Sequence, residues 1–146
     1  MKVLILHQHF NIPQEGGPLR SFYLAKALID FGIVPIVITA RSEKTYRQIN
    51  VEGIEVHYLP VAYDNRFGFW KRSISFLHFV LGAIRLAGRL PGLNVCYAIS
   101  VPLTVGLAAR FIKFRRRIPY IFEVGDLWPD APIQLGFVRN YFFKWL

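Results

Sequence analysis

The sequence is poor in the residues that build disulfides and metal centres. Its 146 residues include one cysteine, Cys96, so an internal disulfide and a cysteine-based zinc site are both excluded. Cys96 lies in the apolar run NVCYAIS, which predicts a buried structural thiol rather than a nucleophile. No cluster of carboxylates has the spacing of metal ligands, so we expect no metal. A single cysteine suits a reducing compartment, and we expect a cytoplasmic protein.

Acidic residues are missing from a long central part of the chain. The sequence has 18 Lys plus Arg against 9 Asp plus Glu, and residues 65–122 contain neither Asp nor Glu. A surface of one sign attracts phosphates, whether in nucleic acid, anionic lipid or a diphosphate substrate. The alternative is an ordinary solvated basic surface. The cations in this span are Arg66, Lys71, Arg72, Arg85, Arg89, Arg110, Lys113, Arg115, Arg116 and Arg117.

Long hydrophobic segments and the common nucleotide fingerprints are missing too. The first ten residues, MKVLILHQHF, do not match a signal peptide, and we expect a first strand there. The apolar stretch between Arg72 and Arg85 is too short to cross a bilayer, which takes about 20 residues. Gly16 and Gly17 match neither the G-x-G-x-x-G spacing nor the P-loop. NAD binding and ATP hydrolysis through those motifs are therefore disfavoured.

What the sequence does contain is an alternation of short apolar runs with helix-length segments. The runs are unbroken and rich in valine and isoleucine, as in parallel strands that are covered on both faces. They occupy residues 3–6, 34–39, 54–59, 95–99 and 120–124. The alternation predicts an α/β fold, namely a Rossmann-like open parallel sheet with helices on both faces.

Helices are expected after Pro18 and at 67–90 and 101–117, whereas residues 41–52 are expected to form a loop or a short helix. Pro18 suits a first helical turn, and Gly32 suits a left-handed C-terminal cap. The spacing of apolar residues predicts one buried face for the first helix. That face would hold Leu24, Ala25, Leu28 and Phe31.

The helix expected at 67–90 is apolar around most of its circumference. Two interpretations remain open: it packs against the sheet, or its apolar face lies on a membrane with the basic residues toward the head groups. His78 is expected to be solvated rather than a ligand. One narrow polar stripe is predicted from Lys71, Ser75, His78, Gly82, Arg85 and Arg89.

Polar residues and glycines gather where the predicted strands end, which is where open parallel sheets bind ligands. Gly16 and Gly17 open a helix whose N–H groups favour an anion, although a plain turn would also explain them. His7 and His9 follow the first strand, either as ligands for phosphate or sugar hydroxyls or as ordinary loop residues. Ser100 follows residues 95–99, either as a binding residue or as an N-cap.

The most informative stretch is YIFEVGDLWPDAP, residues 120–132. Asp126 follows Gly125 and is expected at the rim of the sheet, as a hydrogen-bond acceptor or a general base. Glu123 is expected to be partly buried, because it points away from the face that Val124 occupies. A buried carboxylate is costly unless it is paired, so we expect an arginine close to Glu123.

Three blocks of sequence together carry a family resemblance. GGPLRSFYLAKALIDFGIVPIVIT, SVPLTVGLAARF and PYIFEVGDLWPDAPIQLG resemble the N-terminal domain of family 4 glycosyltransferases, closest to the branch that builds bacterial capsule, O-antigen and related surface polysaccharides. The resemblance implies one half of a GT-B fold, in which two Rossmann-like halves face each other across a cleft. Residues 1–146 would be the N-terminal acceptor domain, with the C-terminal donor-binding domain absent. Such a half should not transfer sugar on its own.

The resemblance also implies roles for single residues. Gly16 and Gly17 would approach the donor diphosphate, and Asp126 would stand where the family has a catalytic or acceptor-contacting residue. Many relatives have a histidine there, so it stays open whether Asp126 takes a proton, orients a hydroxyl or caps the loop. The sequence also departs from relatives at Ile33, where they usually have a histidine. The remaining expected cleft residues are His9, Arg20, Ser100, Glu123 and Trp128.

The function that the resemblance implies is transfer of a sugar from a nucleotide-sugar to a polysaccharide or lipid-linked acceptor, without a cofactor. Acceptors linked to polyprenyl diphosphate lie at the inner membrane face, which would give the basic helix a purpose, with arginines for phosphate and aromatics for lipid or sugar. Peripheral contact with an anionic membrane is therefore expected. Its membrane or phosphate surface would consist of Lys71, Arg72, Arg85 and Arg89.

Two other functions compete with this one. A non-catalytic Rossmann-like binding or docking module would use the basic surface for a membrane or a partner protein. Nucleic-acid binding is permitted by the charge, but no recognised nucleic-acid motif accompanies it, so we expect no nucleic-acid partner.

Overall fold

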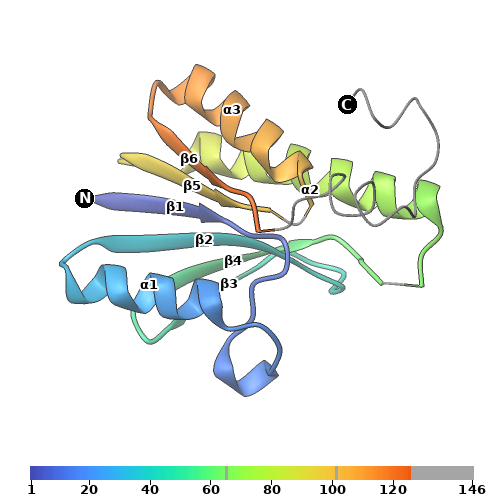
Figure 1. The fold of residues 1–146 in the computed structure, drawn as a ribbon, viewed down its shortest axis with the longest axis horizontal. Coiled ribbons are helices and arrows are strands. Elements are labelled where there is room, and N and C mark those ends of the chain that lie inside the picture. The colour runs from blue at the N-terminus through green and yellow to red at the C-terminus, as the bar shows by residue number, and fades with distance from the viewer. Residues whose placement is uncertain (65, 101, 126–146) are drawn as a thin grey trace, which may run out of the picture.

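The computed structural model of the chain describes residues 1–64, 66–100 and 102–125 (Figure 1). Its strands are β1 (Lys2–Leu6), β2 (Val34–Arg41), β3 (Arg47–Val51), β4 (Ile54–Pro60), β5 (Val95–Ile99) and β6 (Tyr120–Glu123). Its helices are α1 (Arg20–Asp30), α2 (Phe69–Arg89) and α3 (Thr104–Arg116), with a 3-10 turn, η1, at Pro13–Glu15. The five predicted strands and three predicted helices are all present among these elements.

The strands of the described residues form one sheet in the order β3-β4-β2-β1-β5-β6. All neighbouring pairs are parallel except β3 and β4, which are antiparallel. The predicted Rossmann-like α/β fold is thereby confirmed. The chain moves from β1 to β2 on one side and later returns to place β5 on the other side. The strand order therefore reverses at β1 and β5, and an open α/β sheet binds its ligands at such a switch point.

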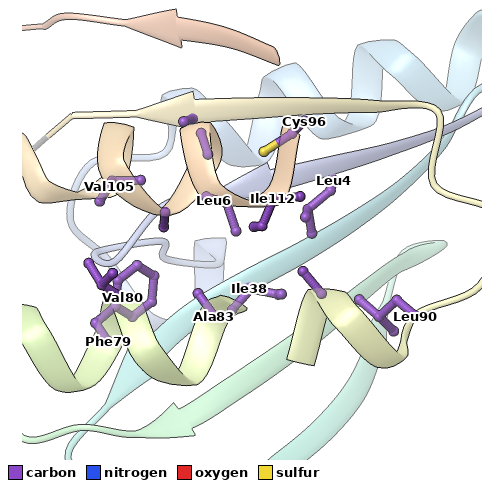
Figure 2. Packing of buried hydrophobic residues seen from close by; sticks show 14 of the residues in the cluster. Leu4, Leu6, Ile38, Phe79, Val80, Ala83, Leu90, Cys96, Val105 and Ile112 are labelled. Carbon is purple, nitrogen blue, oxygen red and sulfur yellow. The ribbon is translucent and has the colours of Figure 1, made fainter. Parts of the chain in front are cut away.

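Helix α1 covers one face of the sheet, and α2 and α3 cover the other (Figure 1). Alternate residues of β1 serve the two faces: Val3 and Ile5 pack toward α1, whereas Leu4 and Leu6 pack toward α2 and α3. Figure 2 shows the second of these cores, where strand residues meet apolar side chains of both helices. They include Ile38 and Cys96 from the sheet, Phe79, Val80 and Ala83 from α2, and Val105 and Ile112 from α3.

Cys96 is completely buried in this core. Burial in apolar surroundings disfavours the thiolate and raises the pKa of Cys96 to about 12. The prediction of a structural thiol is confirmed.

The first helix ends as predicted but buries a different set of residues. Gly32 follows the helix with a φ of +70°, the left-handed conformation that glycine adopts without strain. Phe31 was predicted to be buried and is instead 82% exposed. The prediction is wrong because the helix has ended at Asp30, so Phe31 no longer continues its apolar face. The buried residues of α1 are Ser21, Phe22 and Ala25.

The prediction of a loop or short helix at residues 41–52 is wrong, because this segment contains β3. The strand joins β4 through a turn in which Glu52 and Gly53 have φ values of +50° and +86°. Most residues of β3 are exposed, as befits an edge strand with a polar sequence. Such a strand lacks the continuous apolar run that identified the others.

Helix α2 has the predicted length, but its polar residues do not form the predicted single stripe. Ser75 is buried, and its hydroxyl donates a hydrogen bond of 2.8 Å to the Ala62 carbonyl oxygen. Gly82 lies against Leu59, whose Cδ1 would be 3.0 Å from an added Cβ. Small residues of α2 thus face the sheet, whereas His78 is exposed, as predicted. None of the described helices has the length and hydropathy needed to cross a bilayer.

Candidate functional site

A hollow of about 200 Å³ lies at the carboxyl ends of β1, β5 and β6, beside the first turn of α1. It coincides with the switch point of the sheet, so the topology itself favours a ligand here. We call the polar side chains that line it the switch-point site. They are His7, Arg20, Ser21, Tyr97, Ser100 and Glu123.

Glu123 is the acidic residue among the side chains that line the hollow, and both of its carboxylate oxygens have a partner. It is the last residue of β6, and its side chain is 15% exposed. One carboxylate oxygen, Oε1, forms an ion pair with Nη1 of Arg20, and the other, Oε2, accepts a hydrogen bond of 2.6 Å from the Tyr97 hydroxyl. The predicted arginine partner is confirmed as Arg20, the first residue of α1. The Arg20 side chain is 77% exposed, so the ion pair connects a half-buried carboxylate with a guanidinium that is open to solvent.

Tyr97 is a residue of the site that sequence reasoning missed. Its hydrogen bond to Glu123 is the largest cause of its raised pKa, and burial adds to it. Tyr97 therefore stays protonated and acts as a donor. The register pairs Tyr97 with Ile121 and Ile99 with Glu123, so Tyr97 and Glu123 project on the same side of the sheet. The alternation of residues in VCYAI indicates which side of the strand Tyr97 occupies, but only the register of β5 and β6 shows that this tyrosine meets Glu123.

His7 lies directly after β1 and is neutral at pH 7. Burial is the main cause that lowers its pKa to about 4, and the nearby His9 lowers it further, whereas Glu123 opposes the shift. His7 Nδ1 and the Ser21 hydroxyl share a hydrogen bond of 2.8 Å. A neutral imidazole offers one donor and one acceptor, so the ring can bind a hydroxyl group. Ser21 was also missed, because its hydrogen bond joins the start of α1 to the residue after β1, and no local sequence pattern indicates that contact.

Ser100 ties the end of β5 to the end of β6. Its backbone N–H donates to the Glu123 carbonyl oxygen at 2.9 Å, and its hydroxyl oxygen accepts from the Gly125 N–H at 2.9 Å. The N-cap alternative for Ser100 is wrong, because the N-cap of α3 is Leu103. Ser100 instead anchors the backbone that leads to Asp126. The predicted catalytic residue Asp126 and the predicted wall residue Trp128 lie outside the described residues.

Gly16 and Gly17 lie next to the hollow but do not line it, whereas Pro18 and Arg20 do. Both glycines have positive φ values, +72° and +84°, and an added Cβ on Gly17 would be 2.8 Å from Nδ2 of Asn11. The turn therefore requires glycine. No side chain caps the N-terminus of α1, so its first N–H groups are not used by a cap.

The other predicted residues lie away from the hollow. His9 packs against Tyr63, with 4.7 Å between ring centroids, and burial lowers its pKa. It is not among the lining residues. On α2, Lys71, Arg85 and Arg89 are exposed, but Arg72 is half-buried and its Nη2 donates to the Phe67 carbonyl oxygen at 3.1 Å.

Chemically, the switch-point site suits a neutral ligand rich in hydroxyl groups. At pH 7 it combines one carboxylate, one guanidinium, a phenol, two hydroxyls and a neutral imidazole, so its charges cancel. Such a group of donors and acceptors can bind several hydroxyls through hydrogen bonds. In the part of the chain that the structure describes, no three His, Cys, Asp or Glu side chains are grouped so that they could hold a metal ion.

Fold and geometry together define a class: a Rossmann-like α/β domain with a polar hollow at the switch point of its sheet. The family follows from comparison of sequences. The chain belongs to the glycosyl transferase 4-like domain family, whose model matches residues 16–146. The family membership expected from the three sequence blocks is thus confirmed, and the domain is of the glycosyltransferase type.

Two solved structures have a similar fold. The C-terminal domain of a hydrogenase from Pyrococcus furiosus matches with a TM-score of 0.58 and 10% identity, covering 84% of this chain and 91% of that domain. Sucrose-phosphate synthase from Thermosynechococcus elongatus matches with a TM-score of 0.58 and 11% identity, covering 96% of this chain. The match spans only 36% of the synthase chain. At such identities these similarities show the fold alone. No protein of curated function matches the chain.

Proposed function

We propose that this chain is the acceptor-side half of a GT-B glycosyltransferase. It would transfer a sugar from a nucleotide-sugar to a saccharide or polyprenyl-diphosphate-linked acceptor in the synthesis of bacterial cell-surface polysaccharide. The observation that carries the proposal is the Glu123 carboxylate, held by Arg20 and Tyr97 at the switch point of a glycosyl transferase 4-like domain. A second, donor-binding half agrees with the match to a little over a third of the synthase chain.

Glu123 would position the acceptor. A carboxylate offers about four lone-pair positions, and its two known partners leave some of them for hydroxyl groups of a saccharide. Arg20 uses part of its fork on Glu123, and its exposed remainder can bind a further oxygen, including a phosphate oxygen. The site would therefore hold a sugar whose neighbouring hydroxyls meet a carboxylate and a guanidinium.

The turn before α1 would face the donor diphosphate. Gly16 and Gly17 have no side chains to block close approach, and an uncapped helix N-terminus favours negative charge. Asp126, the residue after Gly125, would be the catalytic or acceptor-orienting carboxylate. The residue before it, Gly125, is held by the hydrogen bond that its N–H donates to the Ser100 hydroxyl oxygen.

The experiment is sugar transfer by the complete enzyme, with a panel of labelled nucleotide-sugars and lipid-linked or free saccharide acceptors. We expect Glu123→Gln to raise the acceptor KM at least tenfold and to leave the donor KM within twofold. The reason is that the amide cannot accept as many hydrogen bonds and loses the attraction to Arg20. The matched control is Glu52→Gln, because Glu52 is also paired, with Lys26 at 3.0 Å, but lies outside the switch-point site.

Two results would contradict the proposal. Acceptor kinetics unchanged by Glu123→Gln would remove Glu123 from the acceptor site. Transfer by residues 1–146 alone would contradict the assignment of donor binding to another domain. The competing function, a non-catalytic docking module, predicts no transfer by the complete protein with any donor in the panel.

A further inference from the structure

The turn that leads into α1 begins with a set of local hydrogen bonds. Glu15 is the last residue of η1 and directly precedes Gly16 and Gly17. Its backbone N–H donates to the Ile12 carbonyl oxygen at 2.9 Å, and the Ile12 N–H donates to Oε2 of Glu15 at 3.4 Å. The Gly16 N–H donates to the Pro13 carbonyl oxygen at 3.4 Å. All these contacts are local, so they shape η1 without attaching it to the sheet.

The attachment to the sheet comes from Arg41, the last residue of β2. Its Nη2 forms an ion pair with Oε1 of Glu15, and the two side chains are 30% and 22% exposed. In each of the other ion pairs between described residues, at least one side chain is more exposed than either of these. Solvent and salt therefore weaken the pair of Arg41 and Glu15 less than the others.

Arg41 is itself held by its neighbours on β4. Its guanidinium carbon lies 4.4 Å from the centroid of the Tyr58 ring, which is a cation–π contact. Tyr58 is 1% exposed and packs in the core between the sheet and α1. The Arg41 carbonyl oxygen accepts a hydrogen bond of 3.1 Å from the Val61 N–H. Glu15 is thus connected through Arg41 to two inner strands of the sheet.

The two glycines that follow Glu15 make such an anchor useful. Glycine has more backbone freedom than any other residue, so a pair of glycines loses much conformational entropy when it is ordered. Gly16 and Gly17 both have positive φ values, a conformation that must be held against many alternatives. A ligand binds more tightly to a loop that already has the bound conformation, because the cost of ordering is not incurred on binding.

We propose that Arg41 is a positioning residue for the nucleotide-sugar donor. Through Glu15 it holds the Gly16–Gly17 turn in the conformation that receives the donor diphosphate. This inference rests on the proposed function, which gives the turn its ligand. A direct contact of Arg41 with the diphosphate is disfavoured, because one end of its guanidinium is used on Glu15 and its face lies on Tyr58.

Donor and acceptor kinetics of the complete enzyme test the positioning role. We expect Arg41→Gln to raise the donor KM at least about fivefold and to leave kcat and the acceptor KM within about twofold, because a loosened turn must be ordered by the donor. This is the reverse of the pattern expected for Glu123→Gln. Glu15→Gln should also raise the donor KM. The double variant should have no more than the larger single effect, because both changes break the same connection.

Backbone NMR relaxation of the chain tests the order of the turn without any sugar transfer. The sequence contains one Gly-Gly pair, so labelling glycine with carbonyl ¹³C and amide ¹⁵N identifies the Gly17 signal directly. We expect its order parameter to be about 0.85 in the unaltered chain and to fall below about 0.6 in Arg41→Gln. The matched control is Arg47→Gln, which removes an arginine whose partner, Glu43 at 3.6 Å, is not part of the turn. It should change neither the order parameter nor the donor KM.

Four results would overturn the proposal. An unchanged order parameter of Gly17 in Arg41→Gln would show that Arg41 does not order the turn. A lowered order parameter with an unchanged donor KM would separate that order from donor binding. A fall in kcat with both KM values unchanged would identify an ordinary structural ion pair. Donor effects that multiply in the double variant would make Arg41 a direct ligand of the donor. Thermal unfolding of each variant checks that it is folded. If the unaltered complete enzyme transfers no sugar, the proposed function fails, whereas the relaxation data still decide whether Arg41 orders the turn.

Discussion

At the scale of single residues, the switch-point site combines a partnered carboxylate with a neutral imidazole. Arg20 and Tyr97 both interact with the carboxylate of Glu123. His7 stays neutral because burial disfavours the imidazolium, although Glu123 lies near enough to oppose that shift. The site therefore has a fixed pattern of donors and acceptors around pH 7. A pattern of this kind favours selection of hydroxyl groups by geometry rather than by net charge.

The neutral state of His7 predicts a loss of stability in mild acid. Its pKa is about 4 in the folded chain against an ordinary value of 6.5. Between these values the unfolded chain binds a proton that the folded chain does not, so the free energy of unfolding falls as the pH decreases. At about pH 5 the contribution of His7 to this loss is about 2 kcal/mol. Urea unfolding at neutral and acidic pH measures it.

The variant His7→Asn should show a shallower loss in acid, because it removes the group that titrates. His78→Asn is the matched control, since it removes an exposed histidine of α2 that lies outside the switch-point site. The buried His57, whose pKa is also lowered mainly by burial, would still contribute in both variants. An equally steep profile for His7→Asn and the unaltered chain would contradict the role given to His7.

At the scale of elements, the end of α3 contains a local conflict between sequence and conformation. Arg117 closes the helix with a φ of +55°, and its N–H donates to the Lys113 carbonyl oxygen at 2.8 Å. This left-handed position normally holds glycine, because a Cβ is unfavourable there by roughly 1 kcal/mol. The helix therefore keeps a basic residue at a site where glycine would be more stable.

Arg117→Gly is accordingly expected to stabilise the chain by about 1 kcal/mol. Arg115→Gly removes the same charge two positions earlier, within the helix, where glycine costs about 0.5–1 kcal/mol. The two variants should therefore change the urea midpoint in opposite directions. If both destabilise the chain, the strain assigned to Arg117 is refuted. If both stabilise it, relief of charge repulsion is the larger effect.

The elements also show which features a sequence can predict. The four inner strands, β1, β2, β4 and β5, were predictable because burial on both faces demands continuous apolar runs. An edge strand makes no such demand: β6 has an apolar sequence all the same and was predicted, whereas β3 has a polar sequence and was not. The polar stripe of α2 was mispredicted because Ser75 satisfies its hydroxyl through the Ala62 carbonyl oxygen and can be buried. In the site, the cost of burying a carboxylate predicted an arginine beside Glu123. The meeting of Tyr97 with Glu123 depends on strand register, which no single segment contains.

At the scale of the whole molecule, many of the basic residues lie in a part of the chain, residues 65–122, that contains no acidic residue. The net charge is +9, and four of the ion pairs join residues outside α2 and α3. The side chains of those pairs are all at least partly exposed, so each pair contributes about 0–1 kcal/mol. The exposed cations of α2 and α3 have only like charges on their own helices instead. The compact state therefore carries a self-repulsion that an anionic partner would relieve.

Salt should consequently stabilise this chain. Raising sodium chloride from about 20 mM to about 300 mM shortens the screening length from about 20 Å to about 6 Å, which weakens repulsion between neighbouring cations. A gain of about 1 kcal/mol corresponds to a rise in Tm of roughly 4 °C for a domain of this size. Thermal unfolding followed by circular dichroism measures the rise.

Two variants with the same loss of charge separate repulsion between the cations of α2 from a general effect of salt. Arg85→Gln with Arg89→Gln should reduce the rise in Tm, because it removes cations that have only like charges on their own helix. Lys26→Gln with Arg47→Gln should not reduce it, because Glu52 and Glu43 are the partners of these cations and salt already weakens both pairs. A fall in Tm with salt would mean that attraction within the ion pairs exceeds the repulsion. Repulsion among the cations of α2 and α3 would then not govern how the stability of the chain depends on salt.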